Sequence, residues 1–160
     1  MMRSAIAGLL GLFLLSSQAS AQLRTAPLPH IFESYNACFA ATPQSGLDPK
    51  ALESLGWNRA TIEADGEKQE TGLIIFGHAE YAPLIILSAE SGSGICSVTA
   101  KLSDAGDYDQ FLAAFGDALP EADKDGNITF RAQGHLVQLA RTGSRSDPAM
   151  RAIILTPEAN

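Results

Sequence analysis

The sequence has few cationic side chains, few thiols and, after its first 21 residues, no apolar run of membrane-spanning length. It holds 11 Lys and Arg against 18 Asp and Glu, a formal net charge of −7 at pH 7. Nucleic-acid binding depends on Lys and Arg contacts to phosphate, and binding to anionic lipid depends on basic clusters. The composition therefore argues against both kinds of partner. The longest later apolar run, Ala82 to Ala89, has the length of a strand, whereas a spanning helix needs about 20 residues.

Histidine and cysteine are too scarce and too scattered to suggest a metal site. The chain has three histidines and two cysteines, whereas a structural zinc site takes four ligands at short spacings. His78-Ala79-Glu80 matches the H-x-E part of the nucleobase deaminase motif, but the P-C-x-x-C part is missing. Asp123 to Ile128 has the composition of a calcium loop, but neither EF-hand frame fits. A frame that starts at Glu121 has Ala132 where the twelfth-position Glu belongs, and one that starts at Asp123 has Ile128 where glycine is required. We therefore predict no metal and no cofactor.

The first 21 residues have the three parts of a secretory signal peptide. Arg3 supplies a basic start, Ala5 to Leu15 is apolar or glycine throughout, and Ala19-Ser20-Ala21 is a small-x-small cleavage site. This pattern predicts cleavage between Ala21 and Gln22, and one exported domain of residues 22–160. Loss of the signal peptide leaves 10 basic and 18 acidic side chains, a net charge of −8. We expect the mature protein in the periplasm or outside the cell.

Export makes a disulfide the simplest role for the only two cysteines, Cys38 and Cys96. Around Cys38, apolar residues recur at steps of three and four, as on one side of a helix. Around Cys96 they alternate, with Val98 and Ala100 on the same side as the thiol. Each cysteine thus lies on the apolar side of its element, which predicts a disulfide between a helix and a sheet. Two buried free thiols are the alternative, and the wide spacing argues against a redox pair.

The pattern along the chain predicts three helices, at residues 29–41, 49–55 and 107–119. The second begins after an N-cap at Asp48, has Pro49 at its first position and stops at Gly56. Trp57 follows at once, and we expect it to anchor the core. The third helix carries apolar residues on one side and ends before Pro120.

Strands occupy most of the remaining chain. Six are predicted, at residues 72–77, 83–90, 95–103, 127–132, 135–141 and 150–156. Residues 63–70 are strongly charged around an Asp-Gly turn signal and predict an exposed hairpin or loop. Because successive strands favour hairpins, the fold class is α+β. We expect a mainly antiparallel sheet of about six strands, with two N-terminal helices and one central helix packed on one face.

The sequence contains no complete catalytic set. His78, Glu80 and Ser93 would form a hydrolase-like trio if they met at one end of the sheet. However, Ser93 does not sit in a G-x-S-x-G turn, and a strand rather than a helix follows it. The glycines around Ser93 are better explained by a flexible turn. A small exported hydrolase that uses these three residues is the alternative prediction.

Charge is distributed unevenly along the second half of the chain. Residues 104–125 contain seven acids and one lysine, whereas residues 131–151 contain one aspartate and four arginines: Arg131, Arg141, Arg145 and Arg151. Guanidinium groups on a sheet can bind carboxylates of a partner, or they can pair with the acidic segment of the same chain. The leading hypothesis is a non-catalytic module that binds a protein or small ligand through one face or edge of its sheet.

Overall fold

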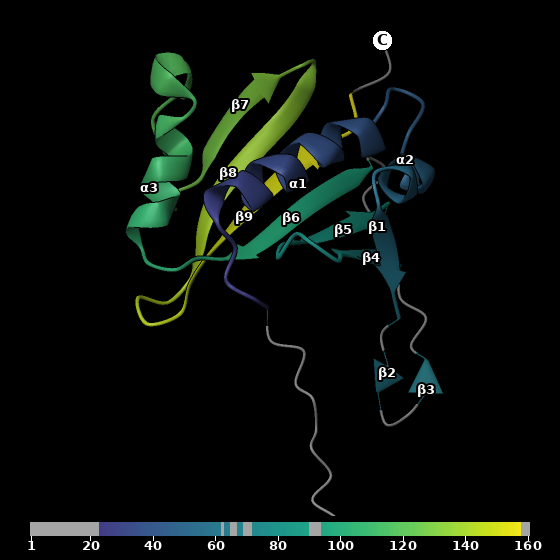
Figure 1. The fold of residues 1–160 in the computed structure, drawn as a ribbon. Coiled ribbons are helices and arrows are strands. Elements are labelled where there is room, and N and C mark those ends of the chain that lie inside the picture. The colour runs from purple at the N-terminus through teal and green to yellow at the C-terminus, as the bar shows by residue number, and fades with distance from the viewer. Residues whose placement is uncertain (1–22, 62, 65–66, 69–71, 90–93, 158–160) are drawn as a thin grey trace, which may run out of the picture.

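The computed structural model describes residues 23–61, 63–64, 67–68, 72–89 and 94–157. The predicted signal peptide, its cleavage site at Ala21 and Gln22, and Ser93 all lie outside the described residues. Within them the chain has an α+β fold, in which helices cover one side of an antiparallel sheet (Figure 1). None of the helices in these ranges is both long and apolar enough to cross a membrane.

The described elements comprise three α-helices, one short 3₁₀ turn and two sheets. The helical elements are α1 (Leu28–Ala41), α2 (Pro49–Ser54), α3 (Gly106–Ala113) and η1 (Gly116–Ala118). The main sheet has the order β1-β4-β5-β6-β9-β8-β7, with every neighbouring pair antiparallel. Its strands are β1 (Trp57–Ala60), β4 (Leu73–His78), β5 (Leu84–Ser88), β6 (Ile95–Lys101), β7 (Ile128–Ala132), β8 (His135–Gly143) and β9 (Pro148–Leu155). The predicted hairpin is present as a separate pair, β2 (Glu63–Ala64) and β3 (Glu67–Lys68).

Two details of the predicted element list are wrong. The main sheet has seven strands rather than six, because β1 forms its edge beside β4. Only Trp57 of this strand is buried, so its sequence carries no alternating pattern. The third helix ends at Ala113, and a 3₁₀ turn follows in place of the two remaining predicted turns. Gly116, at φ +59°, adopts a left-handed conformation that ends regular helix.

The second helix forms for the predicted reason. The Asp48 carboxylate accepts hydrogen bonds from the N–H groups of Lys50 (3.0 Å) and Ala51 (3.3 Å) in the first turn of the helix. Gly56 follows the helix at φ +87° and lets the chain turn directly into β1. A Cβ at position 56 would lie 2.9 Å from His78 Nε2, so the close approach of the two segments also requires glycine.

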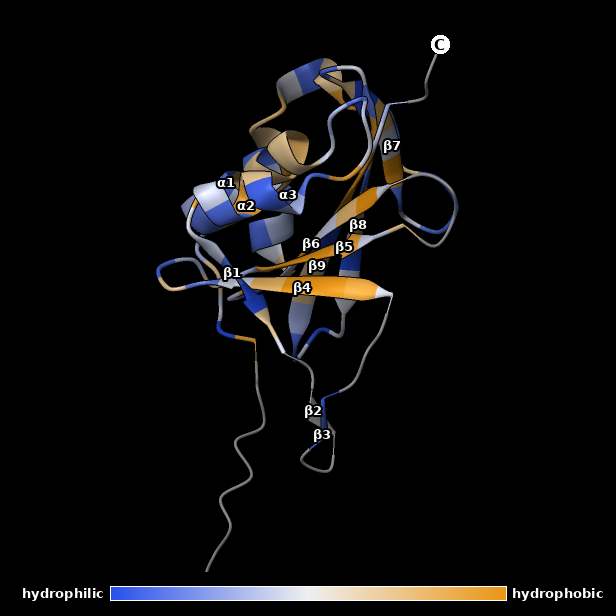
Figure 2. Ribbon diagram, turned by 90° about the vertical axis from the view of Figure 1, so that its right-hand side faces the viewer, coloured by the Kyte–Doolittle hydropathy of each residue, from blue (hydrophilic) through white to orange (hydrophobic). Residues whose placement is uncertain are grey.

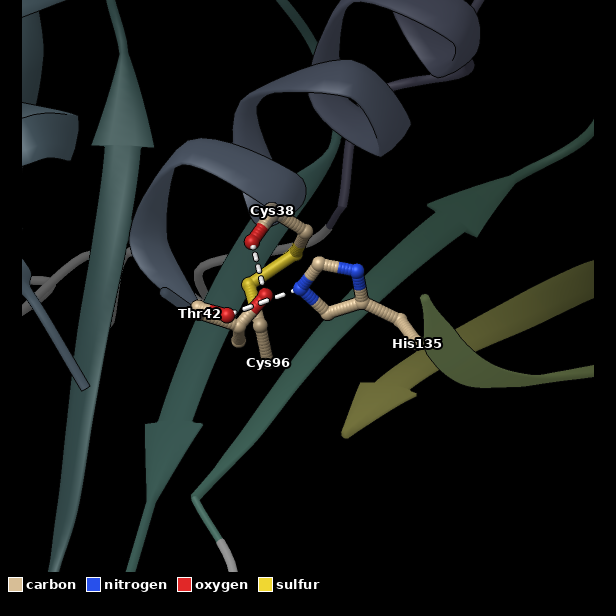
Figure 3. Close-up of a disulfide and its surroundings, with 4 residues drawn as sticks. All are labelled: Cys38, Thr42, Cys96 and His135. Carbon is tan, nitrogen blue, oxygen red and sulfur yellow. Dashed lines mark hydrogen bonds between the residues drawn. A yellow bond between two sulfur atoms is a disulfide. The ribbon is translucent and has the colours of Figure 1, made fainter. Parts of the chain in front are cut away.

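A disulfide between Cys38 and Cys96 joins α1 to the central strand β6, as predicted (Figure 3). The two Cα atoms are 5.6 Å apart, and both residues are fully buried. Beside it, the Thr42 hydroxyl donates to the Cys38 carbonyl oxygen (2.8 Å), and His135 Nε2 lies 2.8 Å from the Thr42 carbonyl oxygen. Because a carbonyl only accepts, Nε2 is the donor in this hydrogen bond. The end of α1 is thus tied covalently to β6 and by a hydrogen bond to β8.

The sheet has an inner face, which the helices cover, and an outer face on the opposite side. In β6, Cys96, Val98 and Ala100 are buried on the inner face, whereas Ile95, Ser97 and Thr99 alternate with them on the outer face. Contacts from α1 reach β5, β6 and β9. Helix α3 packs on α1, with the Phe32 and Phe111 rings stacked 4.7 Å apart. The inner face is therefore the floor of the hydrophobic core, and its buried residues include Phe76, Ile85, Leu87, Val98, Val137, Leu139, Met150, Ala152 and Ile154.

Candidate functional site

The outer face carries apolar side chains where an antiparallel sheet is usually polar. They come from five adjacent strands, β4, β5, β6, β9 and β8, which together span about 20 Å at the usual strand spacing. All are at least partly exposed, and Leu73 (39%) and Leu136 (38%) are among the most exposed large apolar residues. We call this set the outer apolar surface: Leu73, Ile75, Leu84, Ile86, Ile95, Leu136, Ile153 and Leu155.

Strand register makes the outer apolar surface continuous. One row across the sheet runs from Ile75 to Ile86, Ser97 and Ile153. The next row runs through Leu73, Ser88, Ile95 and Leu155. Figure 2 shows the helices on the other side of the sheet and hydrophobic colour along most of β4. At one margin of this surface, Leu23 and Arg24 line a small cavity together with Leu84.

Two of the predicted arginines lie on the outer face. Arg131 pairs with Leu136 at the β7 edge, and Arg151 lies between Thr99 and Ala140. Both are exposed, and neither forms an ion pair within the described ranges. Lys101 is also outward, and it pairs with Asp147 at 2.6 Å.

No outward position of the seven strands is Asp or Glu. The outer face is therefore apolar and cationic, in a chain whose net charge is −7.

The other two arginines lie elsewhere, so the four do not form one row. Arg141 shares the inner side of β8 with Val137 and Leu139, at the end of the sheet beside α3. Its Nη2 lies 2.7 Å from Asp109 Oδ1, and its guanidinium group lies 5.0 Å from the centroid of the Tyr108 ring. Arg141 is thus paired with the acidic segment of the same chain, one of the two roles expected for these arginines. Arg145 is exposed in the turn between β8 and β9.

His78, the first residue of the predicted trio, has a role in the β4–β5 turn. Its Nδ1 accepts hydrogen bonds from the N–H groups of Glu80 (3.1 Å) and Tyr81 (3.3 Å). In a neutral imidazole the proton is then on Nε2, which leaves no free lone pair for a general base. The Tyr81 ring also stacks on His78, with centroids 4.3 Å apart. This histidine therefore stabilises the turn, and the Glu80 side chain points to solvent from an exposed residue.

Of the predicted trio, the structure describes His78 and Glu80, and Ser93 lies outside the described residues. Ser88, the end of β5 before the segment that contains Ser93, pairs with Leu73 at the start of β4. His78 lies five residues farther along β4, about 17 Å away at 3.3 Å per residue. The small cavity beside His78 is lined, among the described residues, by Leu23, Arg24, Gly77, Tyr81, Ala82, Pro83 and Leu84. This lining offers no serine, threonine or cysteine as a nucleophile.

A groove of about 280 Å³ lies between α1 and β1. It is lined by Glu33, Asn36, Ala37, Leu55, Trp57 and Tyr81. Trp57, the predicted core anchor, is 2% exposed and contributes mainly to the floor, whereas Leu55 is 50% exposed at the rim. No sequence pattern indicates this groove, because its residues come from three separate segments.

The Asp123 loop uses its carboxylate internally. Asp123 Oδ1 accepts hydrogen bonds from the N–H groups of Asn127 and Asp125, each at 2.9 Å. The backbone bond from Asn127, and to a smaller degree that from Asp125, lowers the pKa of the Asp123 carboxyl. Across the part of the chain that the structure describes, no three His, Cys, Asp or Glu side chains are grouped to hold a metal.

Comparison with known proteins adds no relative. No protein-family model, no curated protein and no solved structure matches the chain. The function proposed below therefore depends on the sequence and on the geometry of the outer face.

Proposed function

We propose that this chain is an exported, non-catalytic binding module that holds a protein partner on its outer face. The observation that carries the proposal is the outer apolar surface itself. Monomeric proteins rarely expose a continuous apolar area of several hundred Å², and such areas typically mark interaction sites. Covering the eight apolar side chains with a partner would remove them from water, the main favourable term in protein association.

Export is supported by two independent features. The first 21 residues have the composition of a signal peptide, and the disulfide between Cys38 and Cys96 is typical of oxidising compartments such as the periplasm or the cell exterior. N-terminal sequencing of the protein purified from its own cells tests this part of the proposal. We expect the chain to begin at Gln22, and a chain that retains residues 1–21 would contradict it.

The alternative, a small hydrolase, gains no support from the geometry. His78 accepts two backbone hydrogen bonds through Nδ1, and the cavity lining described beside it has no hydroxyl or thiol nucleophile apart from the phenol of Tyr81. A base that activates a nucleophile must lie within hydrogen-bond distance of it. We therefore retain the binding module as the proposed function.

Site-specific photo-crosslinking in the living cell tests the binding role. A photoreactive amino acid at position 97, in the middle of the outer apolar surface, should give an adduct of discrete mass with another protein. The control is position 113, which is exposed at the end of α3. We expect no adduct from position 113, and loss of the adduct from position 97 when Ile153→Asp is added. Equal adducts from both positions, or none from position 97, would contradict the proposal.

A further inference from the structure

We infer that the partner segment is amphipathic, with an apolar stripe bordered by Asp or Glu side chains that pair with Arg131 and Arg151. This inference rests on the proposed function and names the chemistry of the occupant. It follows from the positions of the two arginines, from the absence of acids on the outer face and from what burial requires of a guanidinium group.

The two arginines lie in different rows across the sheet, on either side of the row that contains Ile153. Arg131 belongs to the row of Leu136, whereas Arg151 belongs to the row of Ala140, four residues farther along β8. The rows are thus about 13 Å apart along the strands. Between them lies the row that contains Ile153 and Gln138. A segment that lies along this middle row has one guanidinium group on each of its two sides, both toward the β7 end of the row.

A partner that covers these rows must also satisfy the arginines. Removing an unpaired charge from water costs several kcal/mol, whereas a guanidinium group paired with a carboxylate keeps two parallel hydrogen bonds. The outer face supplies no carboxylate of its own for Arg131 or Arg151 among the described residues. The carboxylates must therefore come from the partner, next to its apolar side chains.

The same charges disfavour two other occupants. A second copy of the chain, stacked face to face, would bring its own Arg131 and Arg151 toward this surface and would add no acid, so like charges would meet. An anionic membrane would attract the two arginines but would repel the rest of a chain with a net charge of −7. A polypeptide segment can instead place its carboxylates only opposite the two arginines, away from the acidic remainder of the chain.

A helix is the simplest form of such a segment. The inner face of the same sheet already accepts one, because α1 packs on β5, β6 and β9. The outer face presents Ile and Leu from the same strands. A helix with one apolar side can therefore lie on the outer face much as α1 lies on the inner face, provided that acidic residues flank its apolar stripe.

Three synthetic helical peptides test the inference on the oxidised mature protein. They share one Leu stripe, and the residues that border it are Glu in the first peptide, Gln in the second and Lys in the third. Fluorescence anisotropy measures the Kd of each at low and moderate salt. We expect the Glu-bordered peptide to bind about tenfold tighter than the Lys-bordered peptide, and salt to reduce this difference.

The matched variant carries Arg131→Glu and Arg151→Glu. Both side chains are exposed, so it should fold with a Tm close to that of the parent, and its preference should reverse toward the Lys-bordered peptide. Equal binding of all three peptides, or binding of none, would overturn the inference. So would a dimer that Ile153→Asp dissociates, or binding to phosphatidylglycerol vesicles that the double variant abolishes.

The two proposals can fail separately. If position 97 gives a protein adduct in cells while the peptides bind equally, the binding role holds and the acidic partner is wrong. If the Glu-bordered peptide is preferred but position 97 gives no adduct, the recognition chemistry holds and the cellular role is wrong.

Discussion

The inner and outer faces of the main sheet carry similar amino acids in very different environments. Ile154 is fully buried under α1, whereas its neighbour Ile153 points to the other side and remains partly exposed. The same contrast separates Leu87 from Ile86, and Val98 from Ser97. Apolar composition therefore does not decide which face is the core. The helices decide it, because the described ones cover the inner face and none of them covers the outer face.

The polar groups of the two faces differ more than the apolar ones do. On the inner side, His135 contacts the Thr42 carbonyl, and Arg141 contacts Asp109. On the outer side, Arg131 and Arg151 have no ion-pair partner among the described residues. Under the proposed binding role, these two arginines are the charges that a partner would have to pair.

The largest expected difference between the two faces is in the free energy of unfolding of two variants of β6, each with one new carboxylate on a different face. Val98→Asp would bury a carboxylate beside α1 and should lower the free energy of unfolding by more than about 4 kcal/mol, enough to abolish folding of a typical domain. Ser97→Asp, one residue away on the outer face, should change it by less than about 1 kcal/mol. Urea unfolding followed by circular dichroism measures both. Similar losses from the two variants would mean that the outer face is also part of the core.

Removal of the disulfide tests how firmly α1 is held on the inner face. The disulfide closes a segment with a sequence separation of 58. The chain-entropy model then gives about 4 kcal/mol of stabilisation, which the double variant Cys38→Ala, Cys96→Ala should lose. Urea unfolding with and without reductant measures it. The control is the variant itself, which reductant should not affect, and an unchanged midpoint in the parent under reductant would contradict the prediction.

A pair of truncations on β5 compares packing on the two faces directly. Leu87→Ala leaves a cavity under the helices and should cost about 2–5 kcal/mol. Ile86→Ala removes a partly exposed side chain from the outer face and should cost less than about 1 kcal/mol. Thermal or urea unfolding of the two variants gives the comparison. The Ile86→Ala variant should instead weaken binding of the Glu-bordered peptide, which the Leu87→Ala variant should leave unchanged wherever it stays folded.

Alkaline pH should lower the stability of the fold through tyrosines on the inner side of the sheet, and we expect this loss to be smaller than those above. Burial raises the pKa of Tyr35, on α1, to about 12 from an ordinary value near 10. Above pH 10 the unfolded chain loses this proton before the folded chain does, so stability should fall as pH rises from 10 to 12. Tyr35→Phe should reduce this loss of stability. Burial also raises the pKa of Tyr108, which should account for the loss that remains in the Tyr35→Phe variant. The outward strand positions include no tyrosine. Urea midpoints at pH 8 and pH 11 measure the change, and a fall of the same size in Tyr35→Phe would contradict the assignment.

Local patterns were sufficient to predict the covered side of the molecule. The steps of three and four around Cys38 and the alternation around Cys96 placed both thiols in the core, where the disulfide forms. The cap at Asp48 predicted the start of α2. Strand β1 was missed because Trp57 is its only buried residue, and the sheet position of such an edge depends on its partner β4.

The outer face could be predicted only in part. Leu73–Phe76, Leu84–Leu87 and Ala152–Leu155 are apolar throughout, a pattern typical of strands with two apolar faces. Which face lacks a cover depends on where the helices dock, and one sequence does not contain that information. The side on which Arg141 lies is easier to predict from the sequence, since period-two alternation in β8 already places it with Leu139.

The disulfide has a mechanical consequence for a protein that holds a partner on its sheet. When the chain is stretched from its ends, the segment between Cys38 and Cys96 cannot extend, because the covalent link carries the load around it. This segment contains β1, β4 and β5, and its sequence separation of 58 would otherwise release about 200 Å of chain. A pulling force would therefore extend only the two ends of the chain and the part after β6. The β4–β5 hairpin, which carries Leu73, Ile75, Leu84 and Ile86 of the outer apolar surface, would not be extended.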